Sequence, residues 1–98
     1  MKATLLQRDR VVLSERAFVD IRVWRVPSSV RGSAHDLKYS LALVVDRASV
    51  LRYDNEARKG DHRHTVEGRQ EPYRFAGAEA LIEDFWTEVD AWMTKPGS

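Results

Sequence analysis

The chain has 98 residues, of which 43% are hydrophobic and 32% charged, a composition typical of one soluble globular domain spanning residues 1–98. It contains no cysteine, which excludes disulfides and thiolate metal sites, and no apolar run approaches the roughly 20 residues of a membrane helix. The first ten residues are too polar for a secretory signal, so a cytoplasmic protein is expected.

The formal net charge of +1 conceals an uneven distribution. Eight Lys or Arg face four Asp or Glu between Lys2 and Lys38, whereas five acids face one Lys between Glu79 and Lys95. The basic segment would attract a polyanion, and the acidic segment would attract a basic partner.

Two antiparallel hairpins are predicted in the first half of the chain. The clearest strand is Ala17–Val26, in which apolar and polar residues alternate. Its partner is Ala3–Leu13, joined to it by a short polar turn. Leu37–Val45 is apolar on both faces at its far end, which predicts a central strand, and after a tight turn at Asp46 the chain returns along Ser49–Tyr53.

The second half is predicted to be a polar loop followed by a helix. The loop runs from Asp54 to Glu67, and Tyr73–Phe75 is interpreted as a short edge strand. Apolar residues recur at helical spacing from Ala78 to Thr94. The predicted fold is therefore α+β, with an antiparallel four- to five-stranded curved sheet and one C-terminal helix packed on a face. Exposed edges of such a sheet often pair, so a homodimer is an expected assembly.

Residues 52–64 form the most polar stretch of the chain, directly after a predicted strand. They include two of the three histidines, four cations, three acids and a glycine. A short turn needs Gly, Asn or Asp, but it does not need His-x-His flanked by Arg, Lys and Asp. This stretch is therefore the candidate site.

The first interpretation of this stretch is acid–base cleavage of RNA, which requires no external cofactor. His62 and His64 would act as acid and base, since histidine titrates near neutrality and positions two apart share a face of an extended segment. Asp54 or Asp61 would orient an imidazole. The proposed phosphate-binding cations are Lys59, Arg58, Arg63 and Arg52, and the proposed base-stacking rings are Tyr53 and Tyr73.

Two other interpretations remain open. Asp61 and the two histidines, completed by Asp54 or Glu56, could bind a metal ion that activates water, although the nearby cations oppose a dication. Alternatively the segment is only a solvated loop, with Gly60 supplying a positive φ. His35 and Trp24 are weaker candidates for the site.

Several sequence blocks resemble the TumE family of toxins from bacterial and archaeal toxin–antitoxin modules. They are Leu51–Glu56, Lys59–His64, Glu71–Phe75 and Leu81–Trp86, and the resemblance also includes the opening Lys2–Leu6. The resemblance implies a toxin that inhibits growth and is neutralised by a partner antitoxin carrying a helix-turn-helix domain.

The sequence and the resemblance together lead to one main hypothesis, a metal-independent toxin endoribonuclease that cuts single-stranded RNA. The alternatives are a non-enzymatic toxin that binds nucleic acid or protein, and a metal-dependent nuclease or another transferase-like toxin. No membrane association is expected.

Overall fold

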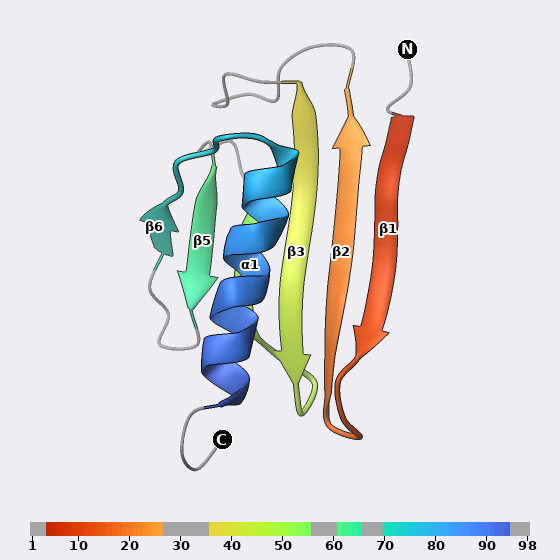
Figure 1. The fold of residues 1–98 in the computed structure, drawn as a ribbon, viewed down its shortest axis with the longest axis vertical. Coiled ribbons are helices and arrows are strands. Elements are labelled where there is room, and N and C mark those ends of the chain that lie inside the picture. Colours follow the sequence, from red (N-terminus) through yellow and green to blue (C-terminus); the bar gives the residue numbers. More distant parts are fainter. Residues whose placement is uncertain (1–3, 27–35, 56–60, 66–69, 95–98) are drawn as a thin grey trace.

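The computed structural model describes residues 4–26, 36–55, 61–65 and 70–94. Within these ranges the chain forms one antiparallel sheet of six strands in the order β1 to β6, followed by a single helix (Figure 1). The elements are β1 Thr4–Val12, β2 Ala17–Arg25, β3 Leu37–Val45, β4 Ala48–Asp54, β5 His62–Thr65, β6 Gln70–Pro72 and α1 Ala78–Met93. The predicted α+β class, with a C-terminal helix on an antiparallel sheet, is confirmed.

The long strands β2 and β3 alternate buried and half-buried residues over all but their last residue. In β2 the buried set consists of Ala17 and the predicted residues Val19, Ile21 and Val23. The equivalent set in β3 begins at Leu37 and includes Tyr39, Leu41 and Leu43. Since both sets point to one side, that side of the sheet must be covered by another element.

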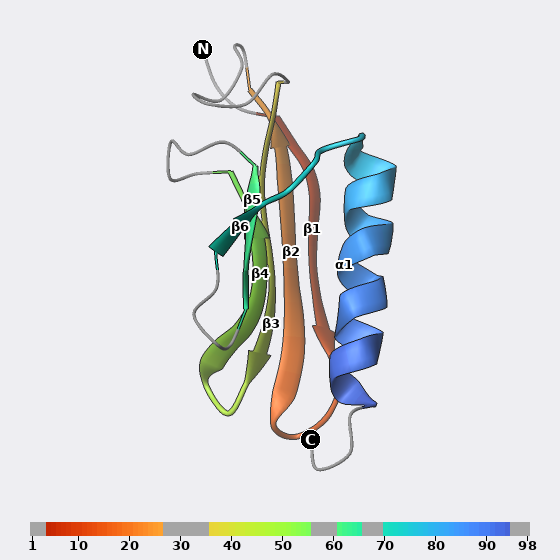
Figure 2. The same cartoon turned by 90° about the vertical axis from the view of Figure 1, so that its left-hand side faces the viewer.

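That element is α1, which lies along one side of the sheet (Figure 2). Leu81, Phe85 and Val89 recur every four residues and are at most 1% exposed. The helix begins after Gly77, whose φ of 116° is unfavourable for any residue with a Cβ. Together the helix stripe and the buried strand residues form one hydrophobic core.

Two short strands follow β4, and the first of them lies within the predicted loop. His62–Thr65 forms β5 and Gln70–Pro72 forms β6, whereas Tyr73–Phe75, interpreted as an edge strand, belongs to no strand. The physical reason is that β5 consists of polar residues without apolar alternation, so only its pairing with β4 reveals it. The predicted loop is therefore wrong over the four residues of β5 and at Asp54, which is the last residue of β4, whereas β6 lies beyond the predicted loop.

Candidate functional site

The described part of the candidate stretch consists mainly of the end of β4 and most of β5. Arg52 and Asp54 close β4, and His62 and His64 lie in β5, which pairs antiparallel with β4. Lys59 and Arg58, predicted to bind phosphate, lie outside the described residues, as does His35. The hairpin of β4 and β5 nevertheless brings the two ends of the stretch side by side.

The register of this hairpin sorts the predicted residues into two groups. Asp54 is opposite His62, and Arg52 is opposite His64. Tyr53 is instead opposite Arg63. Because directly opposed residues of an antiparallel pair share a face, the first four positions belong to one face of the sheet and the last two to the other.

Asp54 is the buried acid of the first group. Its side chain is 6% exposed and forms an ion pair with Arg52, whose Nε lies 2.9 Å from Oδ2 of Asp54. Arg52 itself is 46% exposed, so it connects a buried carboxylate to the surface. The ion pair therefore holds this buried carboxylate in a fixed direction.

Asn55, the next residue, fixes the end of β4 against β3. Its side-chain Oδ1 accepts a hydrogen bond from the backbone N–H of Tyr39 at 3.1 Å, and its Nδ2 donates to the carbonyl of Leu37 at 2.8 Å. Asn55 is fully buried. The side-chain amide thereby extends the ladder beyond the last strand residue, and it holds Asp54 in place.

Asp61 belongs to the other side of the sheet. Its Oδ1 accepts a hydrogen bond of 2.6 Å from the hydroxyl of Tyr39, a residue of the helix-covered core. Burial of the ring, followed by this hydrogen bond, raises the pKa of Tyr39 far above its usual value. Asp61 is thus engaged with the core, whereas Asp54 lies on the histidine side of the hairpin.

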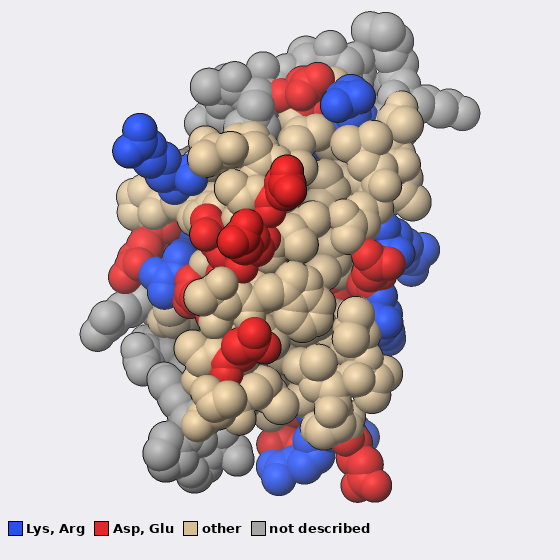
Figure 3. All heavy atoms as spheres, in the orientation of Figure 1, with Lys and Arg blue, Asp and Glu red and all other residues tan. Residues whose placement is uncertain are grey.

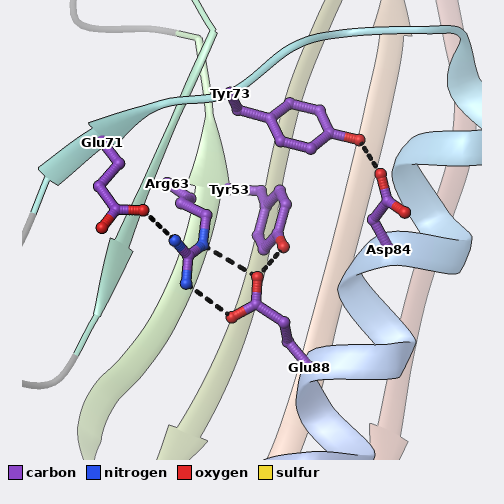
Figure 4. A network of polar contacts seen from close by, with 6 residues as sticks. All are labelled: Tyr53, Arg63, Glu71, Tyr73, Asp84 and Glu88. Atoms are coloured by element: carbon purple, nitrogen blue, oxygen red, sulfur yellow. Dashed lines mark hydrogen bonds and ion pairs between the residues drawn. The ribbon is translucent and has the colours of Figure 1, made fainter.

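Tyr53 and Arg63 take part in a polar cluster that attaches α1 to the sheet (Figure 4). Glu88 of the helix accepts a hydrogen bond from the Tyr53 hydroxyl and two from Arg63. The Arg63 Nε lies 2.9 Å from Oε1 of Glu88, and the Arg63 Nη2 lies 3.1 Å from Oε2. Arg63 also pairs with Glu71 of β6. One guanidinium therefore connects β5, β6 and the helix, with a geometry that favours bidentate pairing.

Tyr73 extends this cluster along the helix. Its hydroxyl donates to Asp84 at 2.6 Å, and its ring meets that of Tyr53 edge-on, with centroids 5.0 Å apart. Burial, and the hydrogen bonds to Glu88 and Asp84, raise the pKa of both tyrosines above the usual value. Both hydroxyls therefore keep their protons at neutral pH and act as donors.

These contacts give Tyr53, Tyr73 and Arg63 a structural role, whatever else they do. Tyr53 is only 2% exposed, so its ring offers no free face for a nucleobase in this arrangement. The roles in nucleic-acid binding assigned to these three residues stay predictions. Their main partners, Glu71, Asp84 and Glu88, were not singled out from the sequence, because pairs 8 to 35 residues apart leave no local pattern.

The metal-site interpretation requires several His or carboxylate side chains close together. Among them, no group of three or more His, Cys, Asp or Glu could hold a metal ion. The side chains of His62 and His64 are not among the described ones. Also within the described ranges, the helix is neither long nor apolar enough to cross a membrane.

Comparison with known proteins gave one match. The family model described as Toxin TumE matches residues 2–93, which include every strand and the helix. No curated protein and no solved structure matched the chain. Because the match spans nearly the whole sequence, the chain belongs to the TumE toxin family.

Proposed function

We propose that this toxin is a metal-independent endoribonuclease. Its site would be the face of the β4–β5 hairpin to which Arg52, Asp54, His62 and His64 belong. The observation that carries the proposal is the register, in which His62 is opposite Asp54 and His64 is opposite Arg52. Two histidines, one buried carboxylate and one cation thus occupy four adjoining positions on a single face. This set contains the types of group needed to cleave RNA without a metal.

The chemistry would use the ribose 2′-hydroxyl as the nucleophile. One histidine removes its proton, the 2′-oxygen attacks phosphorus, and the other histidine protonates the departing 5′-oxygen. The products are a 2′,3′-cyclic phosphate and a 5′-hydroxyl, so no water or metal enters this step. Arg52, with Lys59 and Arg58, would stabilise the negative charge that develops on the phosphate.

Asp54 is the better candidate for orienting an imidazole. The alternative, Asp61, accepts a hydrogen bond from Tyr39 on the helix-covered side. Asp54 is opposite His62 and is held by Arg52. A carboxylate in this position would stabilise the imidazolium that forms when the base takes its proton.

The test is induced expression of the wild type and of His62→Ala and His64→Ala, followed by growth measurement and analysis of total RNA. We expect both substitutions to abolish growth inhibition and RNA cleavage together, since each removes one proton-transfer group. His35→Ala is the matched control, because it removes the one histidine outside the stretch, and it should retain activity.

Two results would overturn the proposal. Killing that survives both substitutions while the RNA stays intact would indicate a toxin that acts by occupying its target. Cleavage by the purified protein that is lost in EDTA and restored by a divalent cation would indicate a metal-dependent nuclease. Fragments ending in a 2′,3′-cyclic phosphate would support the acid–base reaction.

We also propose that a cognate antitoxin with a helix-turn-helix domain neutralises this toxin in the cytoplasm. Membership of a toxin family supports an antitoxin partner. A DNA-binding antitoxin is expected to be basic, and α1 contains five acidic residues with no Lys or Arg. The acidic surface of α1 is therefore the candidate contact for it.

A further inference from the structure

The sheet has one face that α1 does not cover. Figure 2 shows the helix on one side only, and no described helix or strand lies on the other. We call this second side the helix-free face and define it by register across β1 to β4. Its members alternate with the core residues, for example Phe18, Asp20, Arg22 and Trp24 in β2.

The helix-free face is predominantly basic. Its described residues include two acids, Asp20 and Asp54, and five cations, which are Arg8, Arg10, Arg22, Lys38 and Arg52. Each acid is paired within its own strand: Arg22 with Asp20 at 3.1 Å and Arg52 with Asp54 at 2.9 Å. Cations therefore outnumber acids by three on this face, so its positive charge favours the binding of a polyanion.

The opposite surface has the opposite sign. Figure 3 shows acidic side chains gathered over α1, with Lys and Arg mainly toward the edges. A polyanion would be repelled there and attracted to the helix-free face. Because the two sides of the domain carry opposite charge, the domain would turn its helix-free face toward a polyanion.

Two cross-strand rows connect the basic residues to the proposed catalytic positions. One row runs through Arg8, Arg22, Ser40, Asp54 and His62, and each neighbouring pair is directly opposed in the sheet. The other row runs through Arg10, Asp20, Ala42, Arg52 and His64. With about 4.8 Å between strands, each row extends about 19 Å from β1 to β5.

The same face carries two aromatic rings with cations above them. The guanidinium of Arg10 lies 4.5 Å from the ring centroid of Phe18, and the Nζ of Lys38 lies 5.8 Å from that of Trp24. Both rings are partly exposed. Aromatic rings on an open sheet stack nucleobases, while cations beside them contact phosphates.

These observations favour a single-stranded nucleic acid over a duplex or a protein. Rings that lie on a sheet face need unstacked bases as partners, and duplex bases are already stacked. A protein partner would need a continuous apolar interface core, whereas the two apolar rows of this face, one through Val12 and Phe18 and one through Leu5 and Trp24, are separated by the two rows that contain most of its cations.

We propose that the helix-free face binds single-stranded RNA and leads it across β1 to β4 to the histidines of β5. Phosphates would contact Arg8, Arg10 and Lys38, and bases would stack on Phe18 and Trp24. This proposal rests on the proposed function for the delivery of RNA to a cleavage site. It assigns the substrate surface to residues other than Tyr53 and Tyr73.

The experiment measures binding without cleavage. A fluorescein-labelled 12-nucleotide 2′-O-methyl RNA has no 2′-hydroxyl nucleophile, so wild-type protein can be titrated against it by fluorescence anisotropy over a range of salt. Arg8→Gln combined with Lys38→Gln should weaken binding at least tenfold. Removing two phosphate contacts should also reduce the slope of log K against log salt by about 1.4.

The matched control removes two cations elsewhere, with Arg16→Gln combined with Arg74→Gln. It has the same net charge as the test variant, but its changes lie in a turn and after β6, so affinity should fall less than threefold. Phe18→Leu keeps an apolar side chain and removes the ring, and should weaken binding about fivefold or more. Circular dichroism and thermal melting confirm that each variant is folded.

Equal weakening by the test and control pairs would overturn the proposal, because only net charge would then matter. Absence of RNA binding at low salt would overturn it too, as would loss of antitoxin binding in the test pair while RNA binding stays intact. Failure of the proposed function is a separate result: ordinary RNA would remain uncut while the 2′-O-methyl RNA still binds through this face.

Discussion

The two faces of the sheet differ in composition: one is mainly apolar and buried, and the other combines cations with half-buried aromatic residues. The helix-covered face carries the buried core, and its polar groups are paired with one another, as in the Tyr53–Glu88–Arg63 cluster. The helix-free face carries half-buried aromatic residues and cations that reach the surface. Alternation along a strand thus lets one segment contribute both to stability and to a candidate functional surface.

The β4–β5 hairpin is where this difference is sharpest. Tyr53 and Arg63 point toward the helix and contact Glu88, while Arg52 and Asp54, which flank Tyr53 in the sequence, form an ion pair on the other face. Substitutions on the two faces should therefore have separable effects. Changes on the helix-covered face should affect mainly stability, and changes on the helix-free face should affect mainly binding.

The largest expected difference is between Phe85→Ala and Phe18→Ala. Phe85 belongs to α1, is fully buried in the core and meets Tyr53 edge-on at 5.7 Å, so its removal should cost about 3–5 kcal/mol in the free energy of unfolding. Phe18 is half-buried on the helix-free face, and its removal should cost about 1 kcal/mol. Urea-induced unfolding measures both, and equal costs would contradict the assignment of the core to one face.

The next effect is expected from Asn55→Ala, which removes two hydrogen bonds between the end of β4 and the backbone of β3. Because these groups are buried, the loss should cost about 2–3 kcal/mol. Ser49→Ala, an exposed change at the start of the same strand, is the control and should cost less than about 0.5 kcal/mol. A negligible effect at Asn55 would show that the amide does not hold the strand end.

A smaller effect is expected from Glu88→Gln. The charge that pairs with Arg63 is lost, while an amide oxygen remains to accept one hydrogen bond, so we expect a cost of about 1.5 kcal/mol. Glu83→Gln changes an exposed acid on the same helix and is the matched control. If the two variants unfold at the same urea concentration, Glu88 contributes no more to stability than a surface acid.

The long elements could be predicted because their patterns are local. Alternation defines β2 and β3, and the spacing of Leu81, Phe85 and Val89 defines α1. The short strand β5 could not be predicted, because its sequence has no apolar face and its existence depends on pairing with β4. Local pattern identifies an element only where burial imposes one.

The candidate site was likewise only partly predictable. The sequence singled out residues 52–64 as the candidate site, but it could not assign Asp54 and Asp61 to opposite faces, because that depends on the register of β5 against β4. A shift of one residue would exchange the two faces. The sequence therefore suggested the candidate residues, and pairing across the hairpin determines which of their positions lie on the same face.

The smallest effect is expected at the β3–β4 turn, which lies outside both faces. Asp46 and Arg47 have φ values of 51° and 68°, so both adopt the left-handed conformation typical of a two-residue hairpin turn. The left-handed conformation costs arginine more free energy than aspartate, and it costs glycine least. Arg47→Gly should therefore raise the free energy of unfolding by up to about 1 kcal/mol. RNA affinity should change less than twofold, since this cation is not on the helix-free face. A Gly variant that bound RNA much more weakly would mean that the binding surface extends beyond that face to the turn.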